Sequence, residues 1–140
     1  MAEIDAIMGE LLSTTGASRV TLRRDVPGDV FPVTNEVLAD GTPSIKGVAT
    51  PDMARQPVVV EIQQGRQVVQ EDCAAASTEP HFQEMLELYG GLRAQIVTPI
   101  VREGRLTAIV SLHQLGRTRR WSEEEIETAR ETARRIGELL

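Results

Sequence analysis

The strongest constraint on the fold is a pair of apolar runs in the second half of the chain, AQIVTPIV at 94–101 and LTAIVSLHQL at 106–115, separated by REGR. Both runs are rich in β-branched residues and long enough for central strands, and a short glycine-containing segment between two such runs is typical of a hairpin. The sequence therefore predicts two adjacent antiparallel strands that are buried within a sheet.

Both ends of the chain carry apolar residues at spacings of three and four, which is the spacing of one helix face. Near the amino terminus these are Ile4, Ile7, Met8, Leu11 and Leu12, and near the carboxyl terminus they are Ile126, Ala129, Ala133, Ile136 and Leu140. We expect two helices, the first ending before Gly16, that cover one face of the sheet. A remaining apolar stripe would allow a homodimer through these terminal helices.

The only tryptophan lies in LGRTRRWSEEEI, which suggests a nucleic-acid patch, a cation cage or a helix start. Ser122 and Glu125 have the spacing of a capping box, and Trp121 and Ile126 that of a hydrophobic staple. We therefore interpret Trp121 as structural, with a ligand cage as the alternative. The neighbouring arginines are interpreted as a solvated loop edge, because no aromatic platform accompanies them; they are Arg117, Arg119 and Arg120.

The first half between these helices mixes strands and loops. SRVTLRRD at 18–25 alternates between apolar and polar side chains, which predicts a strand. Its apolar face holds Val20 and Leu22, and its polar face holds Thr21 and Arg23. A second strand is expected in 30–41, followed by a loop from Gly41 to Met53. PVVVEIQQG at 57–65 suits either a short helix with Pro57 in its first turn or a strand.

A third strand is expected in RQVVQED at 66–72, and a loop in EDCAAASTEP at 71–80. A helix follows, with Pro80 in its first turn and Gly90-Gly91 at its end. Its inner side holds Phe82, Met85, Leu86 and Tyr89.

The composition is that of one globular domain, expected to span residues 1–140, with 41% hydrophobic and 26% charged residues. The net charge of -6 argues against a nucleic-acid partner, and no apolar run approaches the roughly 20 residues needed to span a membrane. A single cysteine excludes an intrachain disulfide. The acidic, amphipathic amino terminus differs from a signal peptide, so a reduced, cytoplasmic setting is expected.

In this order, the segments resemble a GAF domain. The resemblance is most specific in GLRAQIVTPIVREGRLTAIVSLHQLGRTRRWSEEEIETARETARRI, which is similar to the closing pattern of that family, and QGRQVVQED is similar to the segment that leads to its ligand-side loop. The resemblance implies an α+β, PAS-like fold with a central antiparallel sheet of about five or six strands. It places the terminal helices on one face and a small-molecule pocket under a loop-and-helix lid on the other.

GAF domains bind cyclic nucleotides, bilins, haem, amino acids, anions or no known ligand, so the resemblance does not name the ligand. Bilin-attaching members would carry cysteine beside histidine, or Asp-X-Cys-Phe, and the segment from Asp72 to Ala75 matches neither. The Asn-Lys, Phe and Asp-Glu signature of cyclic-nucleotide-binding members is absent as well. No cofactor is assigned.

The expected pocket wall is the mixed face of the last strand, because its other face is entirely apolar. The mixed face holds Thr107, Ile109, Ser111 and His113. Gln95 is the expected polar neighbour on the preceding strand. The expected lid comprises Phe82, Met85 and Tyr89, and Cys73 completes the candidate ligand-binding residues.

No catalytic or metal-ligating residue is predicted. Free methionine sulfoxide reductases of this fold use two cysteines, whereas this chain has only Cys73, flanked by acids that oppose its ionisation. Neither close-spaced metal ligands nor a nucleophile elbow is present. The predicted function is a sensory or regulatory domain without catalysis, in which an unidentified small molecule changes how the terminal helices pack. The alternatives are a thiol-based reductase and a ligand-free dimerisation module.

Overall fold

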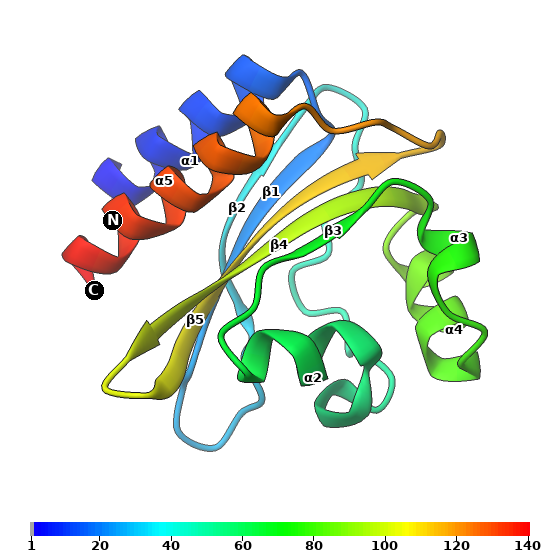
Figure 1. The fold of residues 1–140 in the computed structure, drawn as a ribbon, viewed down its shortest axis with the longest axis horizontal. Helices are drawn as coiled ribbons and strands as arrows, with labels where there is room; N and C mark the ends of the chain where they lie inside the picture. The colour runs from blue at the N-terminus through cyan, green and yellow to red at the C-terminus, as the bar shows by residue number, and fades with distance from the viewer. Residues whose placement is uncertain (1) are drawn as a thin grey trace.

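The computed structural model describes residues 2–140, which form a five-stranded antiparallel sheet with strand order β2-β1-β5-β4-β3 (Figure 1). The strands are β1 (Arg19–Arg24), β2 (Val33–Leu38), β3 (Val68–Gln70), β4 (Leu92–Arg102) and β5 (Arg105–Leu115). The predicted hairpin is confirmed as β4 and β5, the long pair next to the centre of the sheet. Its turn has positive φ at both Glu103 and Gly104, which matches the right-handed twist of the flanking strands.

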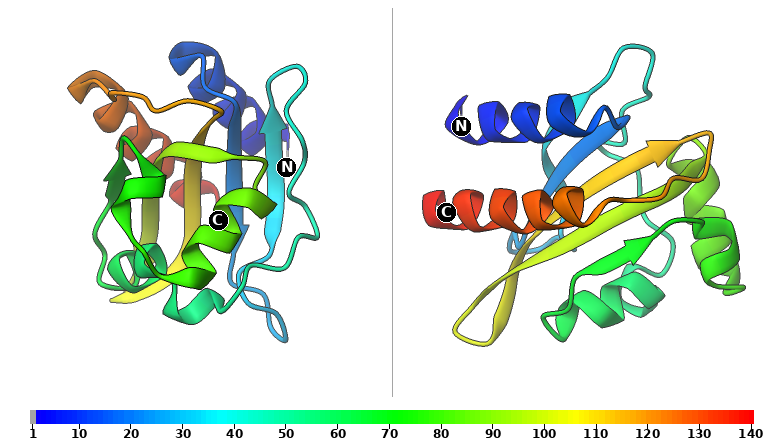
Figure 2. Two further views of the ribbon diagram at one scale, coloured as in Figure 1. Left: turned by 90° about the vertical axis from the view of Figure 1, so that its right-hand side faces the viewer. Right: turned by 45° about the horizontal axis from the view of Figure 1, so that its top comes forward.

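Helices cover both faces of this sheet (Figures 1 and 2). One face carries α1 (Ala2–Thr15) and α5 (Glu123–Leu139), which lie side by side. The other face carries the lid layer, which we define as η1 (Met53–Arg55), α2 (Pro57–Gln63), α3 (Cys73–Ala76) and α4 (Pro80–Leu88). The predicted α+β architecture is therefore confirmed. No helix in residues 2–140 has the length and apolar character needed to cross a membrane.

The face under α1 and α5 is a continuous apolar cluster. The predicted stripes supply it from the helix side, with Met8 and Ile136 fully buried, and Leu22 and Ile96 meet them from the sheet. Burying apolar area of this kind is the main stabilising contribution in a domain of this size.

The start of α5 has the predicted cap. The Ser122 hydroxyl accepts from the Glu125 backbone N–H at 3.0 Å, and the Glu125 carboxylate accepts from the Ser122 N–H at 3.0 Å. Trp121 is buried in the cluster under the helices, and its indole N–H donates to the Gln70 carbonyl at 3.1 Å. Arg119 lies 4.5 Å from the centre of its ring system. The tryptophan face is thus covered by the chain's own side chains.

The structure resolves one alternative and corrects one prediction in the lid layer. PVVVEIQ forms a helix, as its proline in the first turn favours. The segment 71–80, predicted as loop, contains the short helix α3, because Cys73 turns inward to the apolar cluster while the alanines after it favour helical backbone. The predicted helix at Pro80 is α4, capped by the Glu79 carboxylate on the Phe82 N–H.

Candidate ligand-binding site

A cavity of about 40 Å³ lies between the sheet and the lid layer. Strands β1, β4 and β5 form one wall, and side chains from η1, α2 and α4 form the other. Its polar lining consists of Arg23, Thr50, Gln56, Tyr89, Gln95, Ser111 and His113, and its other lining side chains are apolar. A concave, mostly apolar space with a few convergent polar groups is the usual form of a small-molecule site.

The strand register brings the polar groups of the sheet together. Arg19 of β1 and Gln95 of β4 both lie opposite His113 of β5, one on each side. Because side chains alternate along a strand, the β1 residues Arg19, Thr21 and Arg23 all face the lid layer. Each of them is at least nine-tenths buried.

Arg19 is fully buried and holds three parts of the molecule together. It donates from Nε to His113 Nδ1 at 3.1 Å, from Nη1 to the Pro43 carbonyl at 2.8 Å and from Nη2 to the Tyr89 carbonyl at 2.7 Å. Burial lowers the pKa of Arg19 to about 10, and the nearby Arg23 contributes to this shift. Arg19 still carries its charge at neutral pH, so its role is to fix the sheet to the end of α4.

His113 is a neutral hydrogen-bond acceptor in this arrangement. Its Nδ1 accepts from the Arg19 guanidinium, which leaves Nε2 to carry the ring proton. Burial lowers the pKa of His113 well below its usual value, and the positive charges of Arg19 and Arg23 lower it further. The imidazole therefore stays uncharged at neutral pH.

Arg23 and Tyr89 form the polar end of the cavity. Arg23 donates from Nη1 to the Phe31 carbonyl at 2.9 Å and from Nη2 to the Tyr89 hydroxyl at 2.7 Å. The same hydroxyl is hydrogen-bonded to Thr50. The Tyr89 ring stacks on His113 with a centroid separation of 5.9 Å. Tyr89 thus links the lid to both strands that carry the polar groups.

The structure places five of the seven predicted site residues on the cavity wall, namely Gln95, Met85, Tyr89, Ser111 and His113. Phe82 and Cys73 are fully buried in the adjacent apolar cluster and do not line the cavity. Ile109 of the predicted mixed face also lines it, whereas Thr107 donates to the Ile100 carbonyl instead.

Cys73 lies in an environment that opposes thiolate formation. Burial raises the pKa of its thiol to about 12, and the carboxylate of Asp72 adds to the effect. A nucleophilic cysteine needs the opposite shift.

Sequence reasoning missed Arg23, Thr50 and Gln56 as lining residues, and Arg19 as their support. The alternation of β1 was visible, with its polar side correctly separated from Val20 and Leu22. That pattern does not say whether the polar side meets water or another layer. Thr50 and Gln56 come from irregular backbone, which carries no periodic signal.

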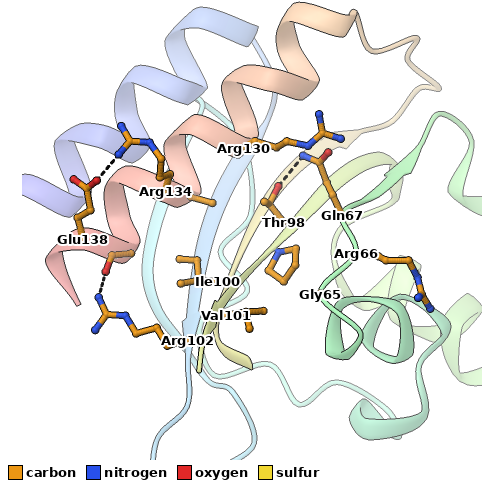
Figure 3. Close-up of a pocket in the computed structure, with 13 residues that line it drawn as sticks. Gly65, Arg66, Gln67, Thr98, Ile100, Val101, Arg102, Arg130, Arg134 and Glu138 are labelled. Atoms are coloured by element: carbon orange, nitrogen blue, oxygen red, sulfur yellow. Dashed lines mark hydrogen bonds and ion pairs between the residues drawn. The ribbon is translucent and has the colours of Figure 1, made fainter. Parts of the chain in front are cut away.

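A wider groove of about 730 Å³ runs between α5 and the end of β4 (Figure 3). Its arginines are exposed and have partners: Arg66 pairs with Glu61, and Arg134 pairs with Glu131 and Glu138. Arg102 donates to a main-chain carbonyl of α5. Exposed ion pairs of this kind contribute little to binding or stability, so the smaller cavity with its buried polar lining is the better candidate site.

Within residues 2–140, no group of three or more His, Cys, Asp or Glu side chains is arranged to hold a metal ion. The candidate site therefore offers hydrogen bonds, positive charge and apolar surface to a ligand.

The structure is similar to those of several light-sensing proteins. The GAF domain of PixJ from Thermosynechococcus elongatus, in its blue-light absorbing form, superposes with a TM-score of 0.84 and 24% identity, over 99% of this chain and 82% of that one. The photoproduct state of a GAF domain from Synechocystis sp. PCC6803 gives 0.78 and 19%, over 97% and 89%. The chromophore-binding domain of a bacteriophytochrome from R. palustris gives 0.79 and 17%, over 97% and 52%.

At these identities the likeness establishes the fold alone. No curated protein sequence matches the chain. The family model for the GAF domain matches residues 2–140, which is nearly the whole sequence. The hairpin, the capped final helix and the lidded sheet are thus those of a protein that belongs to the GAF domain family.

Proposed function

We propose that this GAF domain is a regulatory sensor that binds a small molecule between the sheet and the lid layer and catalyses no reaction. The observation that carries the proposal is the concentration of buried polar groups on one face of the sheet. Arg23, Gln95 and His113 are almost fully buried there, where apolar side chains would be less costly to desolvate. Polar groups retained at such a position are typical of a binding site.

The cavity in the closed structure is much smaller than most metabolites. Its volume of about 40 Å³ is far below the roughly 300–1,000 Å³ of typical ligand pockets. A ligand must therefore displace side chains of the lid, and Tyr89 is the nearest obstacle because its ring covers His113. Binding and lid movement are coupled in this proposal.

The signal would pass through the sheet to the terminal helices. Strands β1 and β5 carry the polar groups on one face, and on the other face their Val20, Leu22 and Leu112 contact the cluster under α1 and α5. A small shift of either strand changes the support of both helices, because packed layers rearrange between discrete states.

A homodimer through α1 and α5 remains a prediction. Among the described residues, the large hydrophobic side chains that are exposed lie on other elements: Val26, Val30, Leu38, Val60, Val69, Leu88 and Val101. The outer side of α5 carries ion pairs such as Arg134 with Glu138. Such a dimer would therefore rely on polar contacts.

Native mass spectrometry of the protein purified from cells tests the sensor proposal. We expect an added mass that is lost on unfolding and returns when the refolded protein meets a metabolite extract. The variant Ser111→Leu fills the cavity and should lose this mass. Thr107→Leu is the matched control, because it lies on the same face of β5 outside the cavity. A folded protein that never acquires mass would instead support the ligand-free module.

A further inference from the structure

The lid side of the sheet holds two buried positive charges and no buried negative charge to match them. Arg19 is fully buried, and Arg23 is 7% exposed. Among the described residues, neither guanidinium lies within ion-pair distance of a carboxylate. Arginines are rarely buried to this degree unless they are paired, because removing a charge from water is strongly unfavourable.

The two arginines differ in the number of hydrogen-bond acceptors that the protein provides for them. Arg19 uses Nε, Nη1 and Nη2 on three acceptors, and the more distant carboxylate of Glu36 favours its charge. Arg23 has two hydrogen-bond acceptors, the Phe31 carbonyl and the Tyr89 hydroxyl, and lies 5.8 Å from the centre of the Tyr89 ring, while its Nε makes no hydrogen bond to a described residue. Arg23 is thus the cation that remains available to a ligand.

Arg23 also stands where two spaces meet. It lines the inner cavity and an outer hollow of about 550 Å³, together with Thr50 and Met53. The hydrogen bond between Thr50 and Tyr89 lies beside this junction. The outer hollow contains the carboxylates of Asp29 and Asp52, whereas no carboxylate lines the inner cavity. An anion is therefore favoured at the inner end of Arg23.

A second feature also indicates a missing partner. The Gln56 side chain is 1% exposed and lines the inner cavity. Its Nε2 donates to the Pro51 carbonyl at 2.6 Å, and its Oε1 is buried without a hydrogen bond. A buried acceptor without a partner is unfavourable, because it loses its hydrogen bonds to water and gains none in the protein. The cavity therefore presents a cation and an unused acceptor.

We propose that the cavity binds a compact organic carboxylate, whose negative charge is held by Arg23 and whose hydroxyl or N–H group donates a hydrogen bond to Gln56 Oε1. The proposal rests on the proposed sensor function and specifies its ligand class. A carboxylate fits better than a phosphate, because one guanidinium is available, a carboxylate is a monoanion, and the space is small. On binding, the Tyr89 hydroxyl leaves Arg23, which removes one of the two arginine contacts at the end of α4 and leaves the Arg19 contact to the Tyr89 carbonyl.

Glycolate and glycolamide are matched probes for this site, since both are small and carry a hydroxyl while only glycolate is charged. Titration of the isotope-labelled protein at constant ionic strength should show saturable glycolate binding that shifts the amides of β1 and α4. Glycolamide should bind at least about tenfold more weakly, as expected for loss of a charge-assisted contact. Inorganic phosphate, titrated in parallel, should bind more weakly than glycolate.

Variants test which residue binds the negative charge of glycolate. Arg23→Gln should abolish the preference for glycolate over glycolamide, whereas Arg24→Gln should keep it, because Arg24 is the exposed neighbour on the same strand. Arg23→Lys keeps the positive charge and replaces Arg23→Gln as the test variant if the glutamine variant does not fold. Tyr89→Phe removes the hydroxyl that competes for Arg23 and should tighten glycolate binding by a few-fold, a gain that a purely structural arginine would not produce.

Three results would overturn the assignment. Equal binding of glycolate and glycolamide would leave the sensor proposal intact and refute the anion site. Phosphate binding that exceeds glycolate binding and depends on Arg23 would refute the carboxylate class. Absence of any glycolate binding, in a protein that still gains mass from a metabolite extract, would refute Arg23 as an anion receptor while keeping the pocket.

Discussion

The two faces of the sheet are built from the same strands and serve different purposes. Along β1, Val20 and Leu22 enter the apolar cluster under the terminal helices, while Arg19, Thr21 and Arg23 face the lid layer. Both sets are buried to a similar degree. The face under the helices consists of close-packed hydrocarbon, and the face under the lid contains charges, amides and a small cavity.

This difference separates stability from function. Hydrocarbon burial under α1 and α5 accounts for much of the folding free energy, because it removes apolar area from water and leaves no polar group behind. The polar face contributes less, since desolvation offsets much of what its hydrogen bonds supply. A domain selected for stability alone would have two apolar faces. Under the proposed sensor function, the polar face is the one that a ligand would use.

The largest expected effect tests whether residues on the lid side of the sheet are as inaccessible to solvent as those under the terminal helices. Because the pKa of Cys73 is raised from 9.0 to about 12, its thiolate fraction at pH 8 is lowered about a thousandfold. Alkylation by iodoacetamide, followed by mass spectrometry, should be slower by at least this factor than in the protein unfolded by guanidinium. Rapid native labelling would show that the lid opens freely.

The same shift has a consequence for stability at high pH. The thiol ionises near 9 in the unfolded chain and near 12 in the folded one, so its contribution is complete below pH 9 and is lost as the pH rises toward 12. Cys73→Ala removes this thiol, so the variant should lose less of its free energy of unfolding than the original protein as the pH rises from 9 toward 12.

The next largest effect is the loss of hydrocarbon on the helix side. Leu22 is fully buried, and Leu22→Ala should lower the free energy of unfolding by about 2–5 kcal/mol. Urea denaturation measures this loss. Val69→Ala, at a half-exposed position on edge strand β3, is the control and should change it by less than about 0.5 kcal/mol. A small effect at Leu22 would contradict the assignment of stability to this face.

A smaller effect is expected from the arginine that anchors the lid. Arg19→Met keeps a flexible unbranched stem and removes the three donors, which should cost about 1–3 kcal/mol, because the lost hydrogen bonds are partly offset by relief of a buried charge. Hydrogen exchange should quicken around Pro43 and Tyr89 and stay unchanged in α1. Uniform acceleration throughout the protein would instead indicate that Arg19 supports the whole fold.

The smallest effect has the opposite sign. The Thr21 hydroxyl is buried without a hydrogen-bond partner, so Thr21→Val should raise the free energy of unfolding by about 1 kcal/mol. The comparison with the neighbouring Leu22→Ala is direct, because the two residues are adjacent on one strand and face opposite layers. Destabilisation by Thr21→Val would mean that the polar face contributes to stability after all.

Much of the fold could be predicted because its signals are local. The capping box at Ser122 and the apolar runs around REGR involve neighbours in the chain, whose spacing determines which conformation buries apolar groups and satisfies backbone hydrogen bonds. The short helix at Cys73 was missed because four residues show no periodicity. The choice between helix and strand after Pro57 stayed open, because Val58, Val59 and Val60 suit a strand as well as a helix.

The candidate site divides in a similar way. Ser111 and His113 were found from the alternation of a single strand, and Met85 and Tyr89 from the inner side of a single helix. Arg23, Thr50 and Gln56 were not found, because nothing in their own segments shows that they meet. Arg19 and His113 are 94 positions apart and become neighbours only through the pairing of β1 with β5.

The sequence by itself determined the terminal helices, the central hairpin, the family resemblance and the separation of β1 and β5 into two sides of different polarity. Tertiary structure alone decided that the polar side of β1 would be covered rather than exposed to water, and hence that Arg23 would be a buried cation without a buried anion. The physical reason is that alternation reports which side chains differ in polarity, whereas burial depends on which distant layer packs over them.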